Sequence, residues 1–168
     1  MTEGSIRTTE PGAAQAAPGS ACDDSPVIST SLARQLRDAG LRWKPASGDR
    51  FQIDRAELDG DVFTVSDLTI EPHEYATGTV LGFNGTTEWA LDSVAVEDAL
   101  WLPREDQLRN LLRGAFLRLE RDGDDYRVVL RARETSDDAA SVEAAFTSVS
   151  APEAYGLALL SILERVSA

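Results

Sequence analysis

The stretch that decides the fold is 117–132, LRLERDGDDYRVVLRA. Apolar and charged residues largely alternate on both sides of Asp122-Gly123-Asp124-Asp125, and a period of two is typical of β-strands. Aspartate and glycine between two such runs indicate a tight turn. The stretch therefore predicts a β-hairpin with one apolar face and one polar face.

The polar face of this hairpin carries arginines on an otherwise acidic chain. They are Arg118, Arg127, Arg131 and Arg133. A basic sheet face could bind an acidic peptide or a phosphorylated ligand through bidentate guanidinium contacts. The alternative is a solvated face on which these arginines pair with acidic neighbours, namely Glu120, Glu134 or Glu143.

Other short runs bounded by turn residues also indicate strands. Asp59-Gly60 and Asn84-Gly85 each separate two of these runs, and Asn-Gly is the strongest two-residue hairpin signal. A turn is expected around His73, after the sheet pattern reaches Pro72. The predicted strands are 51–53, 62–65, 68–70, 79–83, 87–91 and 142–146.

Helices are predicted where apolar residues recur at helical spacing and capping residues flank them. These segments are 30–39, 103–113 and 151–166, with a further short helix at 96–102. Because the strands come as hairpins and not as strand–helix–strand units, we expect an α+β fold in which helices pack on one face of an antiparallel sheet.

The chain has 168 residues and 18.1 kDa, of which 42% are apolar, and this suits one ordinary soluble domain. Residues 1–26 contain three prolines and no aromatic residue, so they cannot bury enough apolar area to offset their ordering entropy. We therefore expect a disordered tail at 1–26 and a single α+β domain at 27–168.

The net charge of −13 repels phosphate backbones and anionic lipids, which argues against general nucleic-acid or membrane-surface binding. Cys22 is the only cysteine and no apolar run is long enough to span a bilayer. We expect a cytoplasmic protein without a cofactor. The expected partner is another protein, and a homo-oligomer remains open.

Few residues offer catalytic chemistry. Lys44 is the only lysine and follows no glycine loop, which excludes a Walker-type NTPase. His73 is the only histidine, so a general base would have to be His73 working with Glu71 or Glu74. The alternative is a solvated loop histidine.

A cluster of carboxylates offers a candidate metal site. Its members are Asp92, Glu97 and Asp98. Hard cations take oxygen ligands, whereas carboxylates at a helix start also serve as caps. Both interpretations stay open for this cluster.

The three tryptophans, Trp43, Trp89 and Trp101, could line a partner groove or anchor the core. Together with Gly48-Asp49-Arg50-Phe51 and the segments 82–94 and 99–108, Trp43 makes the chain resemble a family of small actinobacterial proteins often labelled pilus assembly protein of the CpaE type. The resemblance covers roughly Ser29 to Arg121 and implies a link to pilus assembly. It brings no established catalytic residue.

The leading hypothesis is a cytoplasmic, non-enzymatic interaction or adaptor protein that uses either the segment 82–108, with Trp89 and Trp101, or the arginine face. The alternative is a small hydrolase that uses His73 or the carboxylate cluster. A third hypothesis is an acidic mimic that binds a cationic protein.

Overall fold

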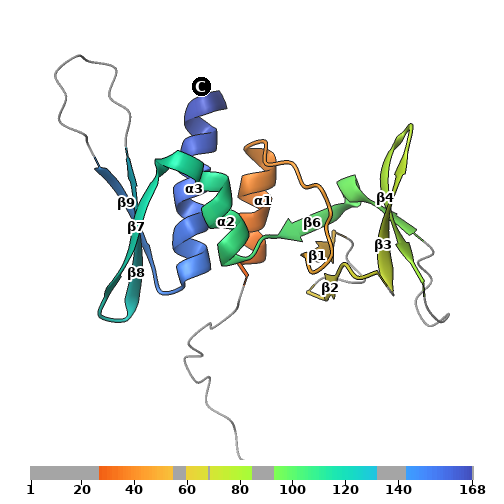
Figure 1. Cartoon of the computed structure of the whole chain (residues 1–168), viewed down its shortest axis with the longest axis horizontal. Helices are drawn as coiled ribbons and strands as arrows, with labels where there is room; N and C mark the ends of the chain where they lie inside the picture. The colour runs from red at the N-terminus through yellow and green to blue at the C-terminus, as the bar shows by residue number, and fades with distance from the viewer. Residues whose placement is uncertain (1–26, 55–59, 68, 85–92, 132–142, 168) are drawn as a thin grey trace, which may run out of the picture.

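The computed structural model describes residues 27–54, 60–67, 69–84, 93–131 and 143–167. Within them the fold is α+β, as predicted, with helices in the middle of an elongated molecule and small antiparallel sheets toward both ends (Figure 1). The predicted tail at 1–26 and the predicted strand at 87–91 lie outside the described residues, as do three candidate site residues, Trp89, Asp92 and Arg133.

The described elements follow in chain order. They are α1 (Thr30–Asp38), β1 (Arg50–Ile53), β2 (Val62–Thr64), β3 (Ile70–Tyr75), β4 (Gly78–Phe83), β5 (Ser93–Ala95), the 3-10 turn η2 (Val96–Asp98), β6 (Ala99–Leu102), α2 (Glu105–Leu112), the 3-10 turn η3 (Arg113–Ala115), β7 (Phe116–Asp122), β8 (Asp125–Arg131), β9 (Glu143–Ser148) and α3 (Ala151–Ser167).

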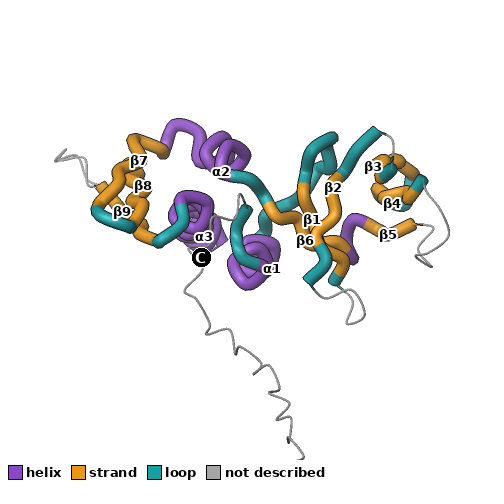
Figure 2. The backbone as a smooth tube through the Cα atoms, turned by 90° about the horizontal axis from the view of Figure 1, so that it is seen from below, coloured by secondary structure: helices purple, strands orange, loops and turns teal. Residues whose placement is uncertain are grey.

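The strands form three sheets of three strands each within the described chain, in the orders β2-β1-β6, β3-β4-β5 and β7-β8-β9. The β7–β8 hairpin matches its prediction, with Asp122 paired to Asp125 across the turn. Gly123 adopts a φ of 63° there, a left-handed conformation that glycine tolerates without steric cost. Figure 2 shows the β7-β8-β9 and β3-β4-β5 sheets at opposite ends, with the helices and β1, β2 and β6 between them.

Two local predictions were wrong. The helix expected at 96–102 is only a 3-10 turn over its first three residues, and Ala99–Leu102 is strand β6, because it pairs with β1 along its whole length. The turn expected around His73 is part of β3, and the turn follows at 76–77. Pro72 is tolerated inside β3 because this is an edge strand, where a missing backbone N–H is not needed for pairing.

Helices α1, α2 and α3 lie where the sequence predicted them, with small shifts at their ends. Ser29 caps α1, since its hydroxyl accepts a hydrogen bond of 3.3 Å from the backbone N–H of Leu32. Helix α2 begins at Glu105, two residues later than Pro103 suggested. Glu153, in the first turn of α3, accepts a hydrogen bond from the backbone N–H of Ser29 and so joins the starts of α1 and α3.

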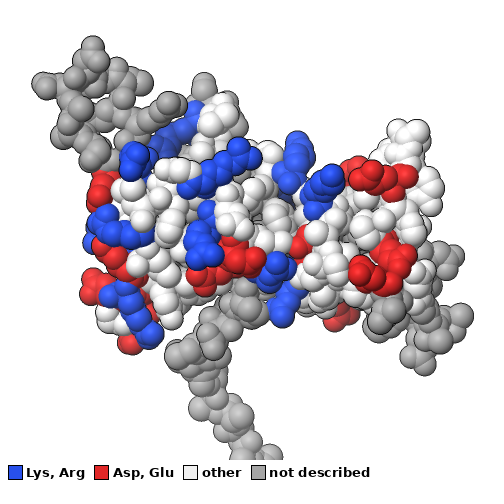
Figure 3. All heavy atoms as spheres, viewed as in Figure 1, with Lys and Arg blue, Asp and Glu red and all other residues white. Residues whose placement is uncertain are grey.

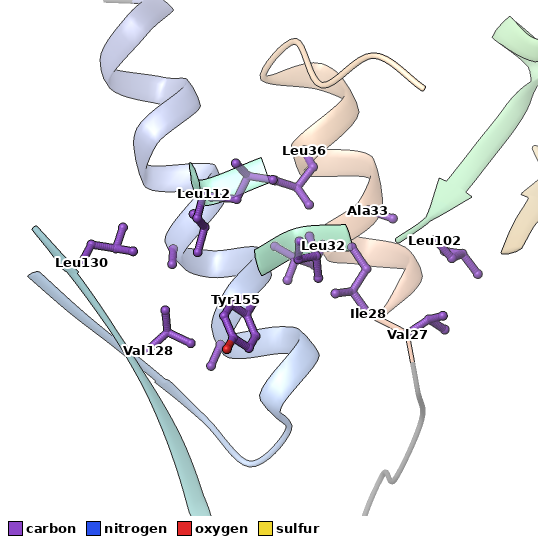
Figure 4. Close-up of a cluster of buried hydrophobic side chains, with 14 of the residues drawn as sticks. Val27, Ile28, Leu32, Ala33, Leu36, Leu102, Leu112, Val128, Leu130 and Tyr155 are labelled. Atoms are coloured by element: carbon purple, nitrogen blue, oxygen red, sulfur yellow. The ribbon is translucent and has the colours of Figure 1, made fainter. Parts of the chain in front are cut away.

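Helix α3 is the centre of the larger core. It packs against α1, α2, β8 and β9. Figure 4 shows side chains of α1, α2 and β8, including Val128 and Leu130, gathered around α3 and its Tyr155. At Gly156 a Cβ atom would lie 2.6 Å from Cδ2 of Leu32, so glycine allows α1 to approach α3 closely. A second, smaller core lies under β1 and the β3-β4-β5 sheet, around Phe51 and Leu81.

Candidate functional site: an aromatic cavity between the helices and the small sheets

A cavity of about 550 Å³ lies where the helical part of the molecule meets the small sheets. One wall comes from α1 and the residues that follow it, and the opposite wall comes from η2, β6 and the beginning of β4. Trp43 and Trp101 both line it. The structure thus brings together two of the three tryptophans that the sequence singled out.

The two indoles belong to a row of aromatic rings. Trp101 is the cross-strand partner of Phe51 in the β1–β6 pair. Trp43 stacks on Trp101, with ring centroids 6.4 Å apart and an interplanar angle of 7°, and its centroid lies 5.5 Å from that of Phe51. Each ring is therefore held by another ring, which gives the cavity a rigid, apolar floor.

The indole nitrogens of the two tryptophans differ in their partners. Nε1 of Trp43 donates a hydrogen bond of 2.9 Å to Asp49. Nε1 of Trp101 is buried and finds no hydrogen-bond partner in the described part of the chain. A buried donor without a partner carries a desolvation cost. Trp101 therefore contributes to the structure through the packing of its ring and not through its N–H group.

Asp49 organises the loop that carries Trp43. The residue is only 2% exposed, and besides the bond from Trp43 its carboxylate accepts hydrogen bonds from the backbone N–H of Ala46 at 3.0 Å and from Nε2 of Gln107 at 2.5 Å. Arg104 approaches the same carboxylate at 3.5 Å and donates to the carbonyl oxygen of Gly48 at 2.7 Å. The loop after α1 is thereby tied to the start of α2.

Sequence reasoning did not identify Asp49 as such a centre. Asp49 lies in the segment 48–51, and Arg104 and Gln107 lie in the segment 99–108. The structure shows that these segments, distant in the chain, meet at one carboxylate.

The rim of the cavity carries charge of both signs. Arg37 is held by Asp54, at 3.0 Å, and the pKa of Asp54 lies below its usual range because Arg37 and then Arg34 donate hydrogen bonds to its carboxylate. Arg42 is exposed and forms no ion pair within the described residues, and its one hydrogen bond there is of 3.5 Å, to the carbonyl oxygen of Arg37. Glu97 lines the cavity from η2.

The cavity also lies at a boundary in the charge distribution. The sequence contains no lysine or arginine between Arg55 and Arg104, whereas acidic residues recur throughout that segment. On the face shown in Figure 3, basic side chains gather over the helices and, with acidic ones among them, over the β7-β8-β9 sheet, whereas the end formed by β3 and β4 shows only acidic ones. Arg37 and Arg42 line the cavity on the basic side of this boundary, and Glu97 lines it on the acidic side.

His73, the candidate general base, lies elsewhere. It is exposed on β3, and its ring lies against Gly82, whose Cβ, if present, would be 2.9 Å from the imidazole. Within the described chain it forms no hydrogen bond to Glu71 or Glu74, and it does not line the cavity. The structure therefore gives His73 no hydrogen-bonded carboxylate among the described residues.

The candidate metal ligands are only partly described. Glu97 and Asp98 are neighbours on η2, while Asp92 lies outside the described residues. No group of three or more His, Cys, Asp or Glu side chains that could hold a metal ion occurs in the described ranges.

On the arginine face of the β7-β8-β9 sheet, Arg118 and Arg127 lie beside glutamates of the same sheet. Arg118 donates two hydrogen bonds of 2.9 Å to Glu143 and one of 2.6 Å to Glu120. Arg127 lies 3.9 Å from Glu120. Of the four candidate arginines, Arg131 is exposed beside Glu143 in the β8–β9 register, and Arg133 lies beyond the described residues. This arrangement matches the internally paired alternative for Arg118 and Arg127, whereas Arg131 is exposed and forms no ion pair in the described residues.

In the described ranges no helix is long and apolar enough to cross a membrane. Comparison of the chain with protein-family models, with curated proteins and with solved structures found no match.

Proposed function

We propose that this protein is a cytoplasmic, non-enzymatic interaction or adaptor domain that binds a segment of a partner protein in the cavity floored by Trp43 and Trp101. The observation that carries the proposal is the stacked indole pair in a cavity of about 550 Å³. Ligand-binding cavities are mostly apolar with a few polar groups that orient the occupant, and tryptophan is enriched among the residues that dominate binding energy.

The charges at the rim define the occupant. Arg42 has no acidic partner in the described residues and stands beside Arg37 on one wall, so a carboxylate of the occupant would find a cation there. The floor would take an aromatic or long aliphatic side chain. The proposed occupant is therefore a protein segment in which an acidic residue neighbours a large apolar one.

The same cavity connects the proposal to the family resemblance. Trp43 and the segment 99–108, which carry part of that resemblance, contribute the floor. Because the related proteins are often labelled for pilus assembly, a pilus-assembly component is the first partner to test. The arginine face is less suited to partner binding, since Arg118 and Arg127 already face internal carboxylates.

A peptide-binding experiment tests this proposal. Peptides selected from a random displayed library on the full chain should share an acidic residue next to an aromatic or aliphatic one, and their affinity can be measured by isothermal titration calorimetry. Thr79→Trp, which places a large ring in the cavity lining, should weaken binding at least tenfold. Thr77→Trp is the matched control, because Thr77 lies in the exposed turn outside the cavity.

Two outcomes would contradict the proposal. One is a selection that enriches no peptide, and the other is a selected peptide that binds the Thr79→Trp variant as tightly as the wild-type protein. Reversal of charge at Arg42 to glutamate should select against the acidic residue in the peptide, which tests the assigned role of the rim separately from that of the floor.

A further inference from the structure

We propose that two copies of this chain associate through the outer edge of β9, which joins their β7-β8-β9 sheets into one six-stranded antiparallel sheet. Within the described residues β9 pairs only with β8, so its second edge presents unpaired backbone N–H and C=O groups. An edge of this kind is a template for strand addition. This inference does not depend on the aromatic cavity.

The two edges of this sheet are built differently. Strand β7 has a register shift between Phe116 and Arg118 and carries charged side chains along its length, and both features hinder the addition of another strand. Strand β9, EAAFTS, has no proline, and no register shift interrupts its pairing with β8. Its only charged residue is Glu143, whose carboxylate is already bound by Arg118. Strand β9 is therefore the unprotected edge.

The register of β9 allows a second copy without electrostatic conflict. Glu143, Ala145 and Thr147 are exposed on the outer face, whereas Ala144 and Phe146 are half-buried on the inner face, against α3. A two-fold axis beside Ala145 places this residue opposite Ala145 of the second copy. The two inner faces then lie on the same side of the joined sheet, and so do the two outer faces. Glu143 then faces a threonine of the second copy, and no like charges meet.

The side chains at this axis also fit a second copy sterically. Ala145 is small, so two copies of it fit opposite each other at the axis. Ala144 would face Phe146 of the second copy, which pairs a small side chain with a large one across the interface. Val149, directly after the strand, is 69% exposed. Two-fold interfaces that use the same surface on both copies are the commonest form of oligomer.

A second copy is favoured over an unrelated strand because the edge is complementary to itself. An extended segment of another protein could also pair with β9, and in that case the isolated chain would remain a monomer. The experiment therefore measures the mass of the isolated full chain by sedimentation velocity over a range of micromolar concentrations. The expected mass is twice the 18.1 kDa of the chain.

Charge placed at the axis gives the sharpest test. Ala145→Lys should abolish the dimer, since two lysines would face each other, and a mixture of Ala145→Lys with Ala145→Glu should restore a species of dimer mass. Thr147→Lys is the matched control, because it adds the same charge on the same face but opposite Glu143 of the second copy, and it should remain dimeric. Circular dichroism on each variant establishes that it is folded.

A monomer at every concentration would overturn the inference, as would a dimer that Ala145→Lys leaves intact. Thr79→Trp, which fills the aromatic cavity, should leave the dimer mass unchanged. The failure of the cavity proposal and the failure of the β9 proposal are thus distinguished by separate variants.

Discussion

Arg118 on β7 and Glu143 on β9 meet through two hydrogen bonds of 2.9 Å, although β8 separates their strands. In the register, Arg118 pairs with Val129, and Val129 pairs with Ala145, so all three share the outer face of the sheet. Val129 is nonetheless only 1% exposed. We attribute this burial to the long side chain of Arg118, which crosses β8 to reach its partner.

We expect Arg118→Ala to lower the melting temperature more than Arg131→Ala does. The first substitution uncovers Val129 and leaves Glu143 without its bidentate partner, whereas Arg131 forms no ion pair in the described residues. Thermal unfolding followed by circular dichroism compares the two variants. Equal melting temperatures would show that Arg118 does not cover Val129.

The stability of the protein should fall in acid partly because of Asp54. Its pKa is lowered by hydrogen bonds from Arg37 and Arg34, so the folded state holds its proton less tightly than the unfolded state does. The stabilising contribution is therefore complete above the unfolded pKa of about 4 and is lost as the pH falls through the lower folded pKa.

Urea unfolding of the wild type and Asp54→Asn at several pH values checks this sign. The difference in unfolding free energy between the two proteins should be largest near pH 7 and should shrink below about pH 4. A difference that is constant with pH, or that grows in acid, would contradict the assignment. The pKa of Glu143 is lowered in the same way by Arg118, so acid dependence should persist in the variant.

The two stacked tryptophans should respond differently to the same substitution. Trp43→Phe removes the 2.9 Å hydrogen bond to Asp49 and leaves that buried carboxylate with one donor fewer, whereas Trp101→Phe removes an indole N–H that has no partner in the described residues. We expect Trp43→Phe to be the more destabilising by about 1–3 kcal/mol.

Chemical unfolding of both variants measures this difference. The comparison controls for the loss of ring area, because each variant replaces an indole of the same stacked pair by a phenyl ring. If Trp101→Phe proves as costly as Trp43→Phe, the hydrogen bond to Asp49 contributes little to stability.

The aromatic cavity could be predicted only in part. The sequence offered Trp43 and Trp101 as groove or core residues, and in the structure Trp43 packs on Phe51 while both indoles line the cavity. It could not bring Arg42 and Glu97 to the same rim, because they come from segments more than fifty residues apart. It likewise left Asp49 unassigned, since a carboxylate in a loop has no periodicity that indicates burial.

The sequence by itself determined the features that depend on neighbouring residues. Alternation around Asp122–Asp125 specified the β7–β8 hairpin, and capping residues with a helical apolar pattern specified α1, α2 and α3 to within a few residues. These signals are local, because turn conformation and side-chain periodicity act over only a few positions.

Tertiary structure decided the features that depend on distant pairing. Ala99–Leu102 became a strand because β1 offered it a partner, and His73 entered β3 because β4 returned beside it. Contacts between distant parts of the chain produce the division into three sheets and place the carboxylate of Asp49 at the junction of two segments. The hydrogen bonds between Arg118 and Glu143 also join separate strands. Such contacts override local propensity because burial and cross-strand packing outweigh it.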